Sequence, residues 1–214
     1  VPTSVVPAVN TTAGLPVGFG TAPVHLASER AQSNKPILCY SYAEAVQQLG
    51  YSKDWAKYTL CEVMYSQFAL YNRGPVVFVN VLDPKTHKKS TSSNKVAKVD
   101  APVLLDTLQI KASTAGSALI DGSDYEAAYD DDGVLVITLL DDGTATAASN
   151  LTLTYDEIDA AAVDADDIIG GINVSDGSVK GLECLNKVFP ITGLVPGIVL
   201  APGWSETPTV AAVM

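Results

Sequence analysis

The chain has 214 residues, of which 47% are hydrophobic and 17% are charged, and its formal net charge at pH 7 is −11. This length and composition are typical of a globular protein with one large or two smaller hydrophobic cores. No run approaches the roughly 18 apolar residues that a membrane-spanning helix needs, which excludes direct membrane insertion.

The negative charge is concentrated in one part of the sequence. Residues 101–180 contain sixteen acidic and two basic residues, whereas residues 1–82 and 181–214 are nearly neutral and residues 83–100 are basic. A strongly acidic segment is repelled by anionic surfaces and stays in solvent. This distribution argues against nucleic acid as a partner.

Residues 1–14 (VPTSVVPAVNTTAG) contain two prolines among β-branched residues and show no helical period. Because proline fixes φ and lacks an N–H donor, this composition predicts an extended arm. The next stretch, LPVGFGTAPVHL, predicts a strand. Gly18 and Gly20 form a G-x-G pattern, but no third glycine follows at the dinucleotide spacing and Pro23 stands where a helix should begin. A phosphate-binding loop is therefore not expected.

Residues 36–82 show an α/β pattern. The run ILCY predicts a short strand, and Ser41 with Glu44 forms a capping box at the start of a helix that Gly50 ends. A second helix is predicted over residues 54–72, with one apolar stripe that belongs to the core. The stripe consists of Leu60, Val63, Met64, Phe68 and Tyr71. The β-branched run PVVFVNVL then predicts a strand covered on both faces.

Residues 83–100 and 101–165 differ in character. The first stretch, DPKTHKKSTSSNKVAKVD, is basic and without period, which predicts a solvated linker; it lacks the aromatic residues of a nucleic-acid site. The second contains the strand-like runs VLLDTLQIKA, SALI, YEAAY, VLVITLL and LTLTY, separated by turn clusters rich in Asp and Gly. It predicts a small all-β unit of sandwich or barrel type with acidic turns.

The turn YDDDG has the acidic character of a calcium loop but not its spacing. If Gly133 occupied the invariant glycine position, Ala128 would stand at the first ligand and Leu139 at the final bidentate ligand. Asp and Gly in a left-handed turn explain the stretch better. We therefore expect no metal at this turn.

Helix and strand signals return after residue 155. Asp164 is the predicted N-cap of a helix that Gly170 ends, GLECLNKVF predicts another helix, and PGIVLAPGW predicts a buried strand. Thr207 as N-cap and Pro208 at the first helical position begin a last helix of seven residues. Because isolated helices below about 12–15 residues are marginal in water, we expect this helix to continue in a longer protein.

The pattern as a whole predicts a discontinuous α/β (α+β) core domain with an inserted all-β domain. The expected order is an arm, the first part of the core, a basic linker, the acidic β domain and the second part of the core, which is truncated. These segments are residues 1–14, 15–82, 83–100, 101–165 and 166–214.

The cysteines and histidines form no recognisable reactive site. Cys39, Cys61 and Cys184 lie far apart in apolar contexts, which predicts reduced thiols in the core. Neither His25 nor His87 has a partner at a metal-ligand spacing, so no metal site is expected.

Ser205 stands two residues after a glycine at a strand-to-helix turn, where hydrolases place a nucleophile. The nucleophile elbow needs G-x-S-x-G, however, and Glu206 and Thr207 follow here without a second glycine. Neither histidine lies in a catalytic context that would activate the hydroxyl. We expect Ser205 to be a polar turn residue and Trp204 to be a packing anchor.

Six stretches follow one another along nearly the whole chain. They are VPTSVVPAVNTTAGLPVGFGTAPV, PILCYSYAEAVQQLGY, VVFVNVLDP, GSDYEAAYDDDGVLVIT, DIIGGIN, and GLECLNKVFP with LVPGIVLAPGWSETPTVAAVM. Together they resemble the tail sheath protein of contractile-tailed bacteriophages and related contractile injection particles. Sheath proteins of this type are considerably longer, with a C-terminal half that completes the core.

The resemblance implies a structural role without catalytic residues, cofactor or metal. It implies a subunit that polymerises as hexameric rings or a helix around a tail tube and contracts to drive the tube through the host envelope. Partners would be neighbouring subunits, the tube protein, and baseplate and terminator proteins. The location would be the virion tail, assembled in the host cytoplasm. The implied subunit-linking arm consists of Val1, Pro2, Thr3, Ser4, Val5, Val6, Pro7, Ala8 and Val9.

Two other functions are compatible with parts of the sequence. An acidic β domain with Asp-Gly turns is also found in stand-alone adhesion or binding modules, but the α/β stretches on both sides weigh against that class. A serine hydrolase built on Ser205 is the more remote alternative.

Overall fold

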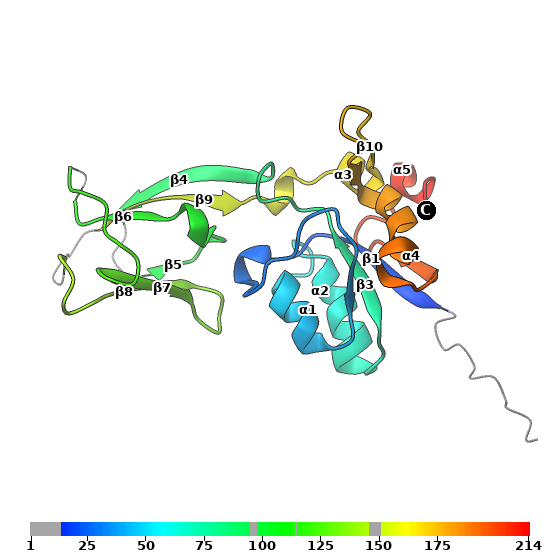
Figure 1. The fold of residues 1–214 in the computed structure, drawn as a ribbon, viewed down its shortest axis with the longest axis horizontal. Coiled ribbons are helices and arrows are strands. Elements are labelled where there is room, and N and C mark those ends of the chain that lie inside the picture. Colours follow the sequence, from blue (N-terminus) through cyan, green and yellow to red (C-terminus); the bar gives the residue numbers. More distant parts are fainter. Residues whose placement is uncertain (1–13, 95–97, 114, 146–150) are drawn as a thin grey trace, which may run out of the picture.

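The computed structural model has two visibly different ends (Figure 1). It describes residues 14–94, 98–113, 115–145 and 151–214. Most of the helices gather at one end with a four-stranded sheet and a two-stranded one, and we call this end the α/β part (residues 14–87 and 159–214). Smaller sheets extend from it at the other end, which we call the β region (residues 88–158). Among the described residues, no helix is long and apolar enough to cross a lipid bilayer.

The sheet of the α/β part joins strands from both ends of the sequence. Its order is β12 (Pro196–Leu200), β1 (Leu15–Gly20), β3 (Val76–Asn80) and β2 (Ile37–Cys39). β1 pairs in parallel with β12 and with β3, and β2 pairs antiparallel to β3. Strands that lie about 180 residues apart in the sequence are thus neighbours in one sheet.

The centre of this sheet forms the main hydrophobic core. All five residues of β3 are buried, as the β-branched run predicts for a strand covered on both faces. Phe19 of β1 and Phe78 of β3 have no exposed surface. Mixed helices and strands in several sheets confirm the expected α/β class.

Helix α1 (Tyr42–Leu49) begins and ends where its local sequence predicts. The Ser41 hydroxyl accepts a hydrogen bond from Glu44 N at 3.2 Å, and the Glu44 carboxylate accepts one from Tyr40 N at 2.8 Å. Gly50 ends the helix with a φ of 72°. The carboxylate therefore serves the residue before the cap rather than Ser41 itself.

The helix predicted over residues 54–72 is shorter in the structure and begins later. The α-helix α2 covers Leu60–Met64 and continues as a π-helix, η2, over Tyr65–Leu70. The residues before it are held by the end of β1, because Thr59 N donates to Thr21 Oγ1 at 3.1 Å and Thr21 N donates to Thr59 Oγ1 at 3.2 Å. These long-range bonds fix the helix start at Leu60.

The remaining helices of the α/β part are short. Asp164 forms the predicted cap of α3 (Ala165–Ile169). Its carboxylate accepts hydrogen bonds from Asp166 N and Asp167 N, and the Asp167 carboxylate accepts one from Asp164 N. The stretch GLECLNKVF is a 3₁₀-helix that runs into a short α-helix rather than one helix. The further elements are η1 (Val24–Leu26), η4 (Ala160–Ala162), α3 (Ala165–Ile169), β10 (Gly171–Ile172), β11 (Val179–Lys180), η5 (Gly181–Lys187), α4 (Val188–Thr192) and α5 (Pro208–Ala211).

The β region contains two three-stranded sheets around a hydrophobic cluster of its own. One sheet has the order β4, β9, β6 and the other β5, β8, β7, and all pairs are antiparallel. Leu153 and Tyr155 from the first sheet and Leu135 and Ile137 from the second lie in this cluster. The elements are β4 (Lys88–Asn94), β5 (Lys98–Val99), η3 (Leu105–Thr107), β6 (Gln109–Lys111), β7 (Tyr125–Tyr129), β8 (Leu135–Leu139) and β9 (Thr152–Ile158).

Three expectations for this stretch need correction. Residues 83–100 are not a linker without regular structure, because β4 pairs with β9 along seven residues, from Lys88 opposite Ile158 onward. β4 has no apolar alternation, so its partner strand decides its conformation. The run VLLDTLQIKA forms a 3₁₀-turn and only a short strand, and SALI contributes a single bridge through Ala118.

Candidate functional site

A pocket lies at the edge of the main sheet where two parallel strands end. β1 leads into Thr21, and β12 leads into the turn with Gly203 and Trp204. The cavity has a volume of about 680 Å³. We call it the Trp pocket; Trp55 and Trp204 line it together with Thr21, Thr59 and Gly203 and with the charged residues Asp54, Lys57 and Glu62. The carboxyl ends of parallel strands are where open α/β sheets bind their ligands.

A tight turn after β12 places one wall of this pocket. Gly203 has a φ of 75°, and Trp204 N and Ser205 N both donate to Ala201 O, at 3.0 and 2.8 Å. A Cβ at Gly203 would lie only 3.2 Å from Thr59 Cγ2. Trp204 packs against the main core, which confirms the predicted packing anchor.

The two indole rings carry unused hydrogen-bond donors. Trp55 Nε1 and Trp204 Nε1 are both buried, and neither has an acceptor among the described residues. A buried donor without a partner costs about 1–3 kcal/mol. No local pattern predicts that these two residues meet, because they stand far apart in the chain; only the turn at Gly203 pointed to Trp204.

Ser205 has the surroundings of a turn residue. It is exposed, and its backbone N–H closes the turn after β12. It lines a different pocket from Trp204, together with Glu62, Met214 and other residues but without a histidine. Among the described residues, its hydroxyl makes no hydrogen bond to a base.

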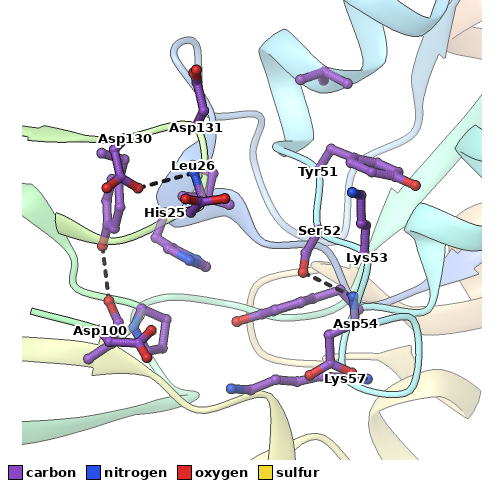
Figure 2. A pocket seen from close by; sticks show the side chains of 17 residues that line it. His25, Leu26, Tyr51, Ser52, Lys53, Asp54, Lys57, Asp100, Asp130 and Asp131 are labelled. Carbon is purple, nitrogen blue, oxygen red and sulfur yellow. Dashed lines mark hydrogen bonds between the residues drawn. The ribbon is translucent and has the colours of Figure 1, made fainter.

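A second cavity, which we call the junction cleft, lies between the α/β part and the β region (Figure 2). Its volume is about 710 Å³. Asp100 and Asp130 come from the β region, whereas Lys53 and Asp54 come from the loop before α2 (Figure 2). Five aspartates and two lysines line the cleft, so it carries an excess of negative charge.

The ring of His25 lies near aromatic rings from both sides of this cleft. Its ring lies 5.9 Å from the Tyr58 ring of the α/β part and 5.5 Å from the Tyr129 ring at the end of β7, measured between centroids. Burial, together with the nearby charges of Lys57 and Arg30, lowers the pKa of His25 to about 3. His25 is therefore neutral at physiological pH, and sequence reasoning did not detect this role.

The acidic turn beside the cleft is held by its own backbone. Asp130 Oδ1 accepts from Asp132 N at 3.1 Å and from Val134 N at 2.9 Å, and Gly133 has a φ of 77°. This geometry is that of the predicted Asp-Gly turn. Among the described residues, no group of three or more His, Cys, Asp or Glu side chains is arranged to hold a metal ion.

The cysteines are buried in the fold, and His87 is held by neighbouring residues. All three thiols are buried and unpaired, and burial raises the pKa of Cys39 and Cys61 to about 12 and that of Cys184 to about 11. His87 Nδ1 accepts from Asp83 N at 3.0 Å, and its Nε2 lies 3.3 Å from the Asp167 carboxylate. The predicted core thiols are confirmed.

The arm residues Val1 to Val9 lie outside the described residues.

Comparison with known proteins identifies one relative. The chain is 29% identical over 198 residues to the tail sheath protein of Burkholderia phage BcepMu, an alignment that covers 87% of this chain and 38% of the relative. No family model matches the chain. No solved structure matches it either. The curated relative confirms the resemblance to a phage tail sheath protein that the residues indicate.

Proposed function

We propose that this chain is part of a structural subunit of a contractile tail sheath. The subunit polymerises helically around a tail tube and contracts to drive the tube through the host envelope. The observation that carries the proposal is the similarity to a tail sheath protein along 87% of the chain. The chain spans 38% of the length of that relative.

The proposed layout is a discontinuous α/β core with an inserted β domain over residues 101–165. Two features support it. The main sheet takes β1 from the start and β12 from the end of the sequence, and the β region has a hydrophobic cluster separate from the main core. Because β4 pairs with β9, the insertion would begin nearer residue 88 than residue 101.

Strand exchange would link the subunits. Residues Val1 to Val9 form the proposed arm, which adds to the sheet of a neighbour through backbone hydrogen bonds. The outer edge of β12 supports such a contact, because no strand of the described residues pairs with it and Val195 and Ile198 beside it are 63% and 50% exposed. An apolar unpaired edge readily accepts another strand.

Contraction would exchange contacts between cores while the strand links persist. Such a lattice moves from a metastable extended form to one of lower free energy. A small gain in each subunit, repeated over many identical copies, supplies the work. The acidic β domain would face outward, where like charges on neighbouring subunits oppose lateral aggregation.

The proposed partners are neighbouring copies, the tail tube, and the baseplate and terminator proteins. The proposed location is the virion tail, after assembly in the bacterial cytoplasm. We propose no enzymatic role: Ser205 is exposed, its pocket holds no histidine, and among the described residues its hydroxyl makes no hydrogen bond to a base. A stand-alone adhesion module is the second candidate, which the acidic β region alone favours.

Electron microscopy of the purified full-length protein tests the proposal. We expect rings or tubes with regular helical symmetry, and a protein that stays monomeric at high concentration would contradict it. Deletion of the β region, residues 88–158, separates the two candidates, since a sheath subunit keeps its self-assembly whereas an adhesion module loses its binding. As a control, Ser205→Ala leaves assembly unchanged.

A further inference from the structure

We propose that the β region is hinged on the α/β part and that the ion pair between Arg30 and Asp106 is the latch that holds it in place. The pivot is the neck formed by β4 and β9, and the junction cleft is the space that the motion widens. The inference goes beyond the proposed function, because it concerns the conformation of a single chain and holds whether or not the chain assembles.

The pivot consists of two neighbouring segments of the chain. Lys88 lies opposite Ile158 in the ladder, and Asp159 N donates a hydrogen bond to His87 O at 2.9 Å just outside it. Ile158 and Leu104 belong to the main hydrophobic core and anchor the neck there, whereas the cluster of the β region is separate. Figure 1 shows β4 and β9 extending away from the α/β part as a ribbon. Two cores joined by such a ribbon can rotate relative to each other while both stay folded.

Few interactions hold the junction away from the neck. Arg30 Nη1 lies 3.6 Å from Asp106 Oδ1, and among the described residues this is the ion pair that joins the two parts. The His25 ring contacts the Tyr129 ring, and no backbone hydrogen bond between described residues crosses the cleft. The Arg30 and Asp106 side chains are 31% and 67% exposed, and exposed ion pairs are weak. The latch is therefore able to open and close.

Charge favours opening once the latch is lost. The β region has five basic and twelve acidic residues, a net charge of −7, and the rest of the chain has a net charge of −4. Like net charges repel each other. In the cleft, Lys53 and Lys57 lie across from Asp100 and Asp130 (Figure 2). Among the described residues neither lysine forms an ion pair, so Arg30 makes the direct contact that opposes the repulsion.

Distances between spin labels on the two parts measure the motion. Ala43 in α1 and Ala128 in β7 are exposed, and Figure 1 shows these two elements on the same side of the neck. Cysteines introduced at both positions can be labelled selectively, because the three native thiols are buried. Double electron–electron resonance on the whole chain then gives the distribution of distances across the junction.

Loss of the latch is expected to widen the junction. We expect Arg30→Gln to add a population at longer distance and to raise the ratio of long to short distances about threefold to fivefold. Asp106→Asn removes the same ion pair from the other side and gives the same result. Its exposed position makes it the second test if Arg30→Gln folds poorly. Unchanged distances in both variants would overturn the inference.

Three further variants separate charge from packing. Arg30→Lys keeps the charge and the short distance, whereas a long population in this variant too would indicate lost packing and contradict the latch. Exchange of the two charges, Arg30→Asp with Asp106→Arg, restores the short distance, and failure to do so counts against the ion pair. Lys89→Gln is the matched control, because it changes the net charge equally but removes the pair with Glu157, 3.3 Å away, inside the neck. A long population as large as that of Arg30→Gln would contradict the proposal.

Discussion

The α/β part and the β region stabilise their strands in different ways. β3 is buried along its whole length, so apolar side chains on both faces hold it. β4 is polar, and it is held by backbone pairing with β9 and by two ion pairs, Lys88 with Asp156 and Lys89 with Glu157. The acidic stretch is thus a solvated surface around a small core, whereas the nearly neutral stretches build the large core.

The largest expected effect tests whether the two cores are independent. Phe78 and Leu153 have no exposed surface and lie in different hydrophobic clusters. We expect Phe78→Ala to destabilise the α/β part by about 3–5 kcal/mol and Leu153→Ala to destabilise the β region by about 2–5 kcal/mol. Amide hydrogen exchange measures each region separately. If either variant lowers protection equally in both, the molecule unfolds as one unit and the comparison fails.

Two glycines with left-handed backbones, one in each region, allow a second comparison in which the expected losses of stability are smaller. A Cβ at Gly50 (φ 72°) would collide with Pro23 O, whereas one at Gly122 (φ 75°) in the β region meets no atom within 4 Å. We expect Gly50→Ala to cost about 2–4 kcal/mol, from strain and overlap, and Gly122→Ala about 1–2 kcal/mol, from strain alone. Thermal unfolding followed by circular dichroism measures both. Similar losses would show that the overlap at Gly50 relaxes.

His25 makes the junction sensitive to acid. The unfolded chain binds a proton at this residue near pH 6.5, but the folded chain does so only near pH 3, because burial lowers the pKa. Stability therefore falls as the pH drops through this window, by about 1.4 kcal/mol per pH unit at most.

Urea unfolding at several pH values measures this dependence. We expect His25→Gln to flatten the dependence of the free energy of unfolding on pH between pH 5 and 6.5, because glutamine does not titrate. Tyr129→Phe is the control, since it removes the hydroxyl that donates to Val103 O at 2.7 Å but keeps the histidine. An unchanged slope in His25→Gln would contradict the assignment.

The smallest effect concerns Asp124 in the β region. Its carboxylate accepts from Thr144 N at 2.7 Å, from Ile120 N at 2.7 Å and from the Thr144 hydroxyl at 2.8 Å, which lowers its pKa below the ordinary 3.8. These bonds stabilise the fold above pH 3.8, and their contribution is lost as the pH falls through the lowered pKa. We expect Asp124→Asn to be less stable at pH 7 and to approach the wild type at pH 2, measured on β-region amides. A constant difference would contradict this.

The sequence predicted the features that local chemistry decides. The caps at Ser41 and Asp164 and the end of α1 at Gly50 depend on residues within one helical turn, and all three are present. The buried strand β3 follows from its β-branched run. Such elements need little information from distant residues.

Features that depend on distant partners were predicted less well. β4 is polar and becomes a strand only through β9, and the start of α2 is set by the bonds between Thr59 and Thr21. Of the candidate site, the turn and Trp204 were predicted, whereas Trp55 on the facing wall was not. The linking arm and the boundaries of an inserted domain stay predictions.

The attachment of the β region has a consequence for protein engineering. Lys88 lies opposite Ile158 in the first ladder pair, and Asp159 N donates to His87 O at 2.9 Å, so the chain leaves and re-enters the α/β part at adjacent points. The two attachment points are about 5 Å apart. A short turn, or a foreign domain whose termini are equally close, would bridge them without stretching the remaining fold. The neck formed by β4 and β9 is thus a natural position for grafting cargo onto the protein.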